Sequence, residues 1–324
     1  MASWLSPQAT EPVAQIVRDG RVESIHHGVV AVVNAEGKKL GSVGDPRVLV
    51  YPRSTLKPLQ TLAVVNTGVE LSDLEIALTT ASHSGSREHR DAVKDFLLGQ
   101  QLSPELLQCP ADWPLERAER LAMEAEGETK PNQLAMNCSG KHAGFLAACQ
   151  HMGWELDSYL SPDHPLQRAI VSTIESFSGE AISHSSIDGC GAPLHAISVL
   201  GLATAMAAFV SSEDPSAQRI VKAVGANAWA IAGRGHANTM IIERLGGIAK
   251  IGAEGLVVIA LPSGVAVAVK ILDGSMRATT PVALDALRRS GALDEATANE
   301  LIALTSERVL GGSRELGGLR VSLG

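Results

Sequence analysis

The sequence predicts an α+β fold in which both ends of the chain contribute strands to one antiparallel sheet. The first fifty residues have the composition and turns of β-strands, most clearly at 27–33 and 38–43. Strand-forming runs return at 248–251, 256–261 and 265–272. Helical patterns dominate the residues between these two regions. Strands, a long helical insertion and strands again are typical of helices packed around an antiparallel sheet.

We expect one domain over residues 1–324, because a chain of this length can bury an ample core. The strands define a sheet subdomain at about 12–52 and 244–324, and the helices define an insertion at about 53–243. Spacing and capping residues predict helices near 55–65, 72–78, 87–98, 137–152, 165–177, 194–210, 215–231, 281–289 and 294–309, and a last strand at 319–323.

Composition excludes several classes of partner. Hydrophobic residues make up 45% of the chain and charged residues 19%, so we expect a soluble globular protein. The net charge of -8 disfavours nucleic acid and anionic membrane as partners. The N-terminal stretch lacks the pattern of a signal peptide, which predicts a cytoplasmic protein. Its four cysteines should then be reduced, and act as thiols or metal ligands before disulfides.

A Ser-x-x-Lys pair, Ser54 and Lys57, lies where a strand at 48–51 leads into the helix at 55–65. Positions three apart share a helix face, so the amine can lie near the hydroxyl. A lysine whose pKa is lowered from ~10.4 can take the serine proton and make a nucleophile. The alternative is an N-capping serine and a solvated lysine.

A second cluster of hydroxyls stands at Ser82-His83-Ser84-Gly85, and a lysine followed two residues later by glycine stands at Lys250 on a predicted strand. Enzymes that acylate the serine of a Ser-x-x-Lys pair usually also carry a Lys-x-Gly motif on a strand. The alternatives are a serine-rich helix start and an edge-strand lysine that points into water.

Two cysteines stand in distinctive settings. Cys138 lies in Asn-Cys-Ser-Gly-Lys-His, which ends with Lys141 and His142, and Cys190 ends Asp188-Gly-Cys. Two thiols with a nearby amine or imidazole could form a small zinc site. The alternative is a pair of buried free cysteines that pack as small apolar residues. Asp188 is a carboxylate suited to binding an ammonium group.

Six stretches occur here in the order found in one known family: Arg-Ser-x-x-Lys-Pro (53–58), Ala-Ser-His-Ser (81–84), Asn-Cys-Ser-Gly-Lys-His (137–142), Pro-Asp-His-Pro (162–165), Asp-Gly-Cys (188–190) and Lys-x-Gly (250–252). The chain resembles the L-asparaginase II family, the Rhizobium etli type of asparaginase, from about 22 to 274. The resemblance implies a serine β-lactamase and glutaminase fold. It also implies hydrolysis of L-asparagine to aspartate and ammonia, and a homodimer.

The same resemblance assigns roles to residues of this chain. It implies two Ser–Lys tandems, Ser54 with Lys57 and Ser82 with Lys250. It implies one zinc ion bound by Cys138, Lys141, Cys190 and a water, and further active-site or substrate-binding roles for Arg53, His142 and Asp188. We expect Ser54 to be the nucleophile, with Ser82 as the alternative.

Three other functions remain open from sequence. Glutamine differs from asparagine by one methylene, so glutaminase activity is the close alternative. A penicillin-recognising acyltransferase or β-lactamase is disfavoured, because no Ser-Asp-Asn and no complete Lys-Thr-Gly motif occurs. A non-enzymatic zinc or thiol protein is the third possibility.

Overall fold

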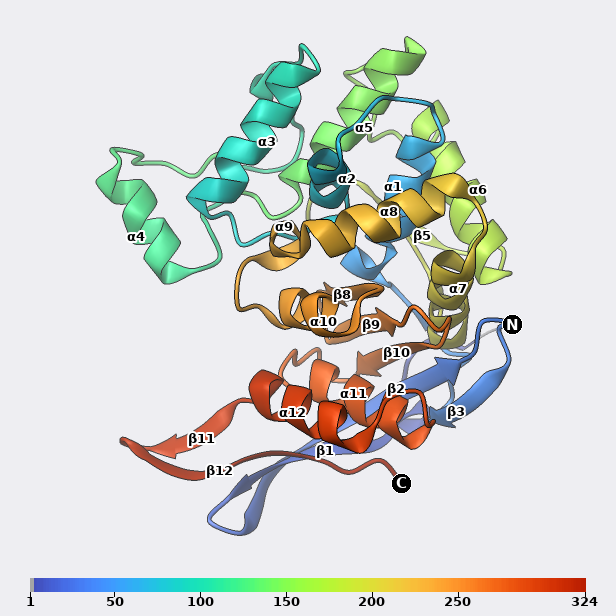
Figure 1. Ribbon diagram of the computed structural model, residues 1–324, viewed down its shortest axis with the longest axis vertical. Coiled ribbons are helices and arrows are strands. Elements are labelled where there is room, and N and C mark those ends of the chain that lie inside the picture. The colour runs from blue at the N-terminus through green and yellow to red at the C-terminus, as the bar shows by residue number, and fades with distance from the viewer. Residues whose placement is uncertain (1–2) are drawn as a thin grey trace.

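An antiparallel sheet that joins the two ends of the chain organises the computed structural model, which describes residues 3–324 (Figure 1). The strands follow one another in the order β11-β12-β1-β2-β10-β9-β8, and β3 also pairs with β2. This arrangement confirms the predicted α+β fold. The bounds are β1 Glu11–Arg18, β2 Arg21–Val33, β3 Lys39–Val43, β8 Ile248–Gly252, β9 Leu256–Ala260, β10 Ala266–Ile271, β11 Arg308–Gly311 and β12 Arg314–Val321.

The register shows how the ends of the chain meet. On one side of the sheet Gln15 of β1 faces Arg320 of β12, and at its centre Val30 of β2 faces Val269 of β10. Residues 29–33 are all buried, which explains why they form an unbroken apolar run rather than an alternating one. The helices α7 (Val199–Ser211) and α11 (Thr279–Arg289) both pack against β2, β9 and β10.

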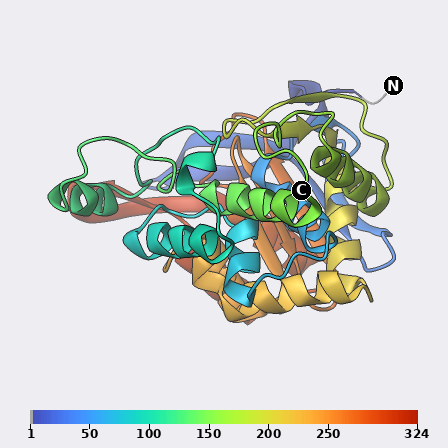
Figure 2. The same cartoon turned by 90° about the horizontal axis from the view of Figure 1, so that it is seen from above.

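Most other helices belong to the segment between the two strand regions, and they gather beyond one end of the sheet (Figures 1 and 2). Two small ribbons accompany them, β4 (Leu49–Val50) with β7 (Ile197–Ser198) and β5 (Ser185–Ile187) with β6 (Pro193–His195). The helices are α1 Lys57–Val65, α2 Asp73–Thr80, α3 Arg87–Gly99, α4 Arg117–Ala125, α5 Ser139–Met152, α6 Pro165–Ser178, α8 Pro215–Ala226, α9 Ala228–Ala232 and α10 Ala237–Leu245. No helix of the described part is long and apolar enough to cross a membrane.

Several element boundaries differ from the predictions. The helix predicted from 194 begins at Val199, because Ser198 caps it by accepting a hydrogen bond from the Gly201 N–H. The helix predicted over 215–231 is interrupted at Asn227, and α10 was not predicted. The last predicted helix is α12 (Glu295–Thr305), which ends early because the chain then forms β11.

Two glycines let α5 approach α2 closely. A Cβ at Gly140 would clash with the Leu78 carbonyl group, and one at Gly144 would clash with the Thr79 side chain. Only glycine permits such contact between helix backbones. Because α2 ends at Thr80 and α5 begins at Ser139, this packing brings the segment after α2 against the start of α5.

Candidate active site

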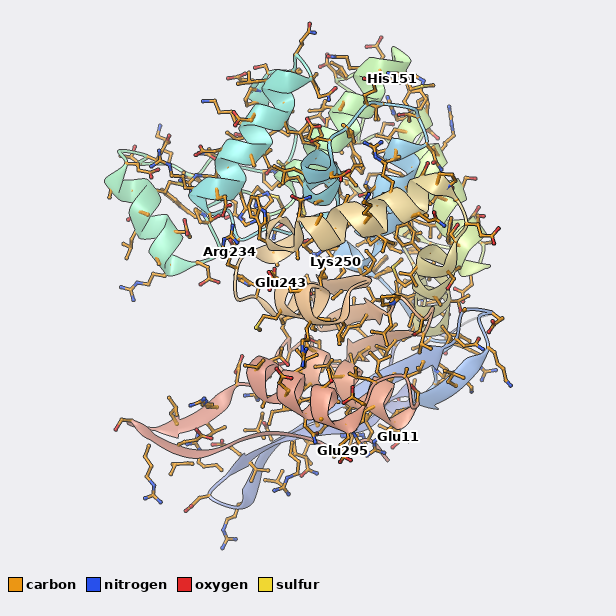
Figure 3. The ribbon with its side chains drawn as sticks, viewed as in Figure 1. Glu11, His151, Arg234, Glu243, Lys250 and Glu295 are labelled. Atoms are coloured by element: carbon orange, nitrogen blue, oxygen red, sulfur yellow. The ribbon has the colours of Figure 1, made fainter. Side chains whose placement is uncertain are left out.

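Ser82 lies between two lysine amines. Its Oγ is 3.0 Å from Nζ of Lys57, at the start of α1, and 2.8 Å from Nζ of Lys250, on β8. Lys250 lies near the middle of the molecule, where the sheet meets the helices (Figure 3). Both lysines are buried, with at most 1% of their surface exposed. The helical segment and the sheet therefore each contribute part of this centre.

The segment that carries Ser82 is held by backbone hydrogen bonds on both sides. The N–H groups of Ser82 and Ser84 donate to the carbonyls of Ile231 and Ala232, at 2.9 and 2.8 Å. Between them the His83 N–H donates to the carbonyl of Asn137 at 3.1 Å. The position of Ser82 is thus set by the end of α9 and by the loop before α5.

His83 cross-links this segment to the start of α5. Its Nδ1 accepts from the Gly85 N–H at 3.2 Å, so its Nε2 carries the proton and donates to Ser139 Oγ at 2.9 Å. Ser139 Oγ in turn donates to the Leu134 carbonyl. Burial, reinforced by nearby His89 and the two lysines, lowers the pKa of His83 well below its ordinary value. His83 is therefore a neutral cross-link.

The two lysines have different surroundings. Lys57 Nζ donates to the Ala81 carbonyl, to Ser82 Oγ and to Cys138 Sγ. These three hydrogen bonds occupy all three N–H donors of its ammonium group. Among the described residues, Lys250 Nζ has two hydrogen-bond partners, Ser82 Oγ and the Ile251 carbonyl at 3.1 Å. Burial, followed by the charge of Lys57, lowers the pKa of Lys250 well below its ordinary value. Lys250 is thus suited to accept a proton.

Ser54 lies apart from this hydrogen-bond network. It stands in the 3₁₀ turn Arg53–Leu56, is half-buried, and its hydroxyl makes no hydrogen bond within residues 3–324. Lys57 is directed at Ser82 instead. The backbone beside Ser54 is strained, because Arg53 has a φ of +53° in the left-handed region that side chains other than glycine rarely adopt.

The predicted zinc ligands lie together below this centre. Lys141 Nζ, on α5, donates to Cys190 Sγ at 3.1 Å. Cys138, Lys141 and Cys190 are all buried. A hydrogen bond between the thiols lowers the pKa of Cys190 and raises that of Cys138. Burial lowers the pKa of Lys141, but the neighbouring Cys190 and Cys138 outweigh this effect and leave it raised. The three donors thus form one interacting cluster.

The donor set is compatible with zinc by its chemistry. Cys138 and Cys190 supply soft sulfur donors, and Lys141 supplies an amine 3.1 Å from Cys190 Sγ, which together are donors of the kind that zinc accepts. Residues 3–324 contain no group of three or more His, Cys, Asp or Glu side chains suited to a metal. A zinc ion bound here therefore requires the lysine amine as its third protein ligand.

Arg53, Asp188 and His142 adjoin the same region. Arg53 Nε donates to Asp188 Oδ1 at 2.7 Å. Burial raises the pKa of Asp188, but the charges of Lys141 and Arg53 outweigh burial and keep it below its ordinary value. His142 Nδ1 lies 2.7 Å from the Tyr159 hydroxyl, while its buried Nε2 has no partner among the described residues. That nitrogen remains available to a ligand.

Sequence reasoning missed Tyr159 and Ser139. Tyr159 is fully buried, accepts from the Gln108 N–H at 2.9 Å and orients His142. It stands in no motif, and its only signal is that the chain has just two tyrosines. Ser139 was part of the Asn-Cys-Ser-Gly-Lys-His stretch, but nothing in the sequence connects it with His83.

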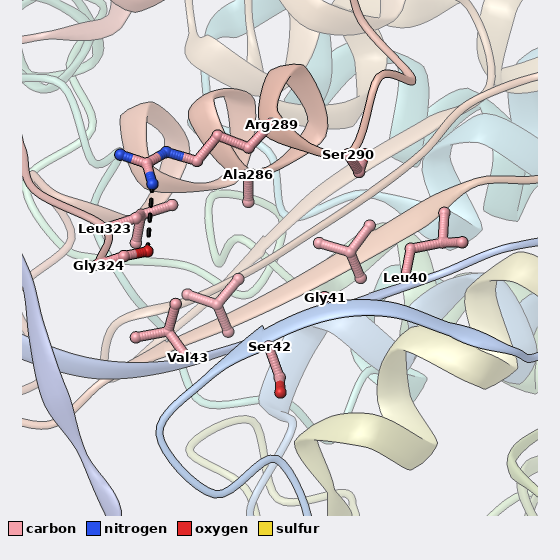
Figure 4. A pocket seen from close by; sticks show the side chains of 11 residues that line it. Leu40, Gly41, Ser42, Val43, Ala286, Arg289, Ser290, Leu323 and Gly324 are labelled. Carbon is pink, nitrogen blue, oxygen red and sulfur yellow. Dashed lines mark hydrogen bonds between the residues drawn. The ribbon is translucent and has the colours of Figure 1, made fainter.

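Cavities elsewhere do not share the serine–lysine centre. One of about 270 Å³ lies between β3 and α11, beside the hydrogen bond from Arg289 to the Gly324 carbonyl at 3.2 Å (Figure 4). None of its lining residues belongs to the centre. A cavity of about 440 Å³ has Arg53 in its wall and so adjoins the site.

Together, the α+β framework and the serine between two buried amines define a hydrolase-type site, in which a hydroxyl can attack and an amine can take its proton. Sequence comparison identifies the family. Residues 14–321 match the model of the L-asparaginase II family, and the chain belongs to that family. Family membership makes it an amidohydrolase of this α+β fold. No curated protein sequence matches the chain.

Solved structures with similar backbones have low sequence identity. A β-lactamase from Mycobacterium bovis is 14% identical, with a TM-score of 0.44, and the match covers 82% of this chain and 95% of that one. A protein described as Mglu in its native form is 15% identical, with a TM-score of 0.44, over 82% of this chain and 65% of that one. EstCE1, described as a hydrolase with promiscuous acyltransferase activity, is 12% identical, with a TM-score of 0.37 and coverages of 87% and 93%.

Proposed function

We propose that this protein hydrolyses L-asparagine to aspartate and ammonia through a serine nucleophile. The observation that carries the proposal is the Ser82 hydroxyl within 3.0 Å of two buried lysine amines, in a chain of the L-asparaginase II family. Ser82 replaces Ser54 as our favoured nucleophile, because Lys57 is directed at Ser82 and Ser54 has no amine within hydrogen-bonding distance in the described chain.

The two lysines take different roles in the proposed reaction. As a neutral amine, Lys250 donates one N–H to the Ile251 carbonyl and turns its lone pair to the Ser82 hydroxyl. Ser82 Oγ bonds to the side-chain amide carbon of asparagine, and its proton passes to Lys250. The C–N bond then breaks, the nitrogen receives that proton and leaves as ammonia. Water hydrolyses the resulting ester and restores Ser82.

Lys57 holds the attacking oxygen rather than deprotonating it. Its ammonium donates to Ser82 Oγ and is fixed by the Ala81 carbonyl. A positive charge there stabilises the negative charge that develops on Ser82 as the proton leaves.

Substrate recognition is assigned to the polar groups beside the centre. Asp188 is suited to bind the α-ammonium, and Arg53 and the unpartnered Nε2 of His142 are suited to bind the α-carboxylate. The Tyr159 hydroxyl supports this use of His142, because by donating to Nδ1 it leaves the proton on Nε2.

The nucleophile is tested by ammonia release from asparagine for wild type, Ser82→Ala, Ser54→Ala and Lys250→Met. Ser42→Ala, at an exposed serine of β3, is the matched control. Ser82→Ala should reduce kcat at least about a thousandfold, and mass spectrometry should place a trapped aspartyl ester on Ser82. An ester on Ser54, with near-wild-type turnover by Ser82→Ala, would reverse the assignment. Comparable turnover of glutamine would make the protein a glutaminase as well.

We also propose that Cys138, Lys141 and Cys190 bind one zinc ion. When bound, zinc would supply a positive charge that helps to position the polar groups of the substrate, and it would join the start of α5 to the turn at Asp188–Cys190. Elemental analysis should find about one zinc per chain in wild type and far less in Cys190→Ser. Cys149→Ser, at a buried thiol outside the cluster, should retain the metal. Equal zinc in all three proteins would refute this ligand set.

A further inference from the structure

The cavity beside Arg53 has the size of a small-molecule site. Its volume is about 440 Å³, within the 300–1,000 Å³ typical of ligand pockets. Its wall comes from the N-terminal segment, β4, β5, β6, β10, the 3₁₀ turn after β4 and the turn between β8 and β9, and it includes Trp4, Tyr51, Arg53, Glu254 and Lys270. Neither Ser82 nor the thiols belong to it, so the cavity is distinct from the serine–lysine centre.

One wall of the cavity carries two cations. Lys270, on β10, is 92% buried, since 8% of its surface is exposed, and its Nζ donates only to the Glu254 carbonyl among the described residues. An ammonium has three N–H donors, so two of them lack a protein acceptor. Arg53 uses its Nε for Asp188, and its terminal nitrogens have no hydrogen bond within residues 3–324. Unused donors on two cations favour an anion between them.

The charges around Lys270 point to a single negative charge on that anion. Burial lowers the pKa of Lys270, Glu254 and Asp273 oppose this effect, and Arg53 adds to it. Glu254 is itself in the wall, and its side chain lies against Gly274. A dianionic phosphate would be repelled by this carboxylate more strongly than a monoanionic carboxylate would.

The rest of the cavity lining is mostly aromatic and aliphatic. The Trp4 ring lies 5.2 Å from Tyr51 and 5.4 Å from His184, centroid to centroid. Leu5, Leu49 and Leu194 continue the apolar surface, and Ile187 at its rim is 74% exposed. Such a surface favours a ligand whose body is apolar.

We propose that this cavity binds a carboxylate with an aromatic or branched aliphatic body. The carboxylate lies between Lys270 and Arg53, and the body lies against Trp4 and Tyr51. Because Arg53 also holds Asp188, the ligand contacts a residue of the active site without occupying the serine–lysine centre. The binding does not depend on amide hydrolysis, so it is tested separately from the proposed function.

The test is calorimetric titration of the full-length protein with 3-phenylpropionate and with the uncharged 3-phenylpropanol. The acid should bind at least about tenfold more tightly than the alcohol, because charge-assisted hydrogen bonds are stronger than neutral ones. Lys270→Met should weaken binding of the acid at least about tenfold and leave that of the alcohol unchanged. Lys94→Met, at an exposed lysine of α3, is the matched control and should bind like wild type.

Three results would overturn the proposal: equal binding of acid and alcohol, unchanged binding by Lys270→Met, or no binding of the acid by wild type up to about 10 mM. If Lys270→Met does not fold, the variant Trp4→Ala replaces it. Trp4 is 44% exposed, so its removal leaves the core intact, and it should weaken binding of both compounds. Undiminished affinity in Trp4→Ala would equally contradict the site.

Discussion

Lys250 is an amine in the interior of the molecule, with a serine hydroxyl 2.8 Å away. A neutral Lys250 in the folded protein lowers the free energy of unfolding, because the unfolded chain binds a proton that the folded chain does not. Its lowered pKa therefore removes stability at pH values between the folded pKa and the ordinary value of ~10.4. That loss is the energetic cost of having a base inside the site.

Lys250→Met should remove this cost and so increase the free energy of unfolding. A lysine with a lowered folded pKa has its full stability above ~10.4 and loses it as pH falls toward the folded pKa. The stability of Lys250→Met relative to wild type should therefore increase as pH decreases, by about 1.4 kcal/mol per pH unit within that window. Urea unfolding at pH 7, 8 and 9 measures it. Lys94→Met should give no such trend, and a flat difference for Lys250→Met would mean that Lys250 is charged when folded.

The family resemblance implied Ser82 and Lys250 as one tandem, but it paired Lys57 with Ser54. Helical spacing predicted that Lys57 lies near Ser54, because the i, i+3 rule describes contacts within a single helix. The Lys57 amine instead donates to the Ala81 carbonyl and to Ser82 Oγ. Both acceptors lie just after α2, so this contact depends on tertiary packing. The unpaired donors of Lys270 were likewise invisible, because the residue stands in an ordinary strand run.

The close contact between α2 and α5 is the structural basis of the site. It holds the segment after α2, which carries Ser82, against the start of α5, where His83 is hydrogen-bonded to Ser139. Both helices were predicted from caps and spacing. Their close approach depends on Gly140 and Gly144. In a sequence, a glycine within a helix indicates only a lower helix propensity. The short elements α10 and β11 were also not predicted, because the structure of a short segment depends on the segments packed against it.

Gly140→Ala should therefore destabilise the protein. Its Cβ would meet the Leu78 carbonyl, a backbone group that cannot move aside cheaply, and overpacking typically costs about 1–3 kcal/mol. Gly225→Ala, in the exposed part of α8 with no atom within 4 Å, should be neutral or stabilise by up to about 1 kcal/mol. Unfolding midpoints compare them, and equal midpoints would show that α5 can shift without loss.

Both structural regions are needed to complete one centre. Ser82 and Lys57 come from the helical segment and Lys250 comes from the sheet, while α7 packs against β2, β9 and β10. The order of strands and helices could be predicted from the sequence, because each has its own periodicity. How the two regions face each other depends on packing that no single stretch encodes.

We expect the helical segment and the sheet to unfold together. The four tryptophans lie outside the main sheet, so their fluorescence reports on the rest of the chain, and hydrogen exchange in β8–β10 reports on the sheet. The two midpoints should coincide. Added aspartate, the product of the proposed reaction, should raise both equally, because it would bind only the complete site. Exchange protection of β8–β10 that persists after the fluorescence change would contradict this coupling.

The pairing of β2 with β10 has a consequence for synthesis on the ribosome. At roughly 5–20 residues per second, β10 emerges tens of seconds after β2. During that interval the apolar run 29–33 has no strand partner on its β10 side and lacks the α7 and α11 cover found in the folded protein. Such a strand is prone to pair with other nascent chains. Soluble yield should consequently depend on chaperone supply and on low expression rate more than on the stability of the finished molecule.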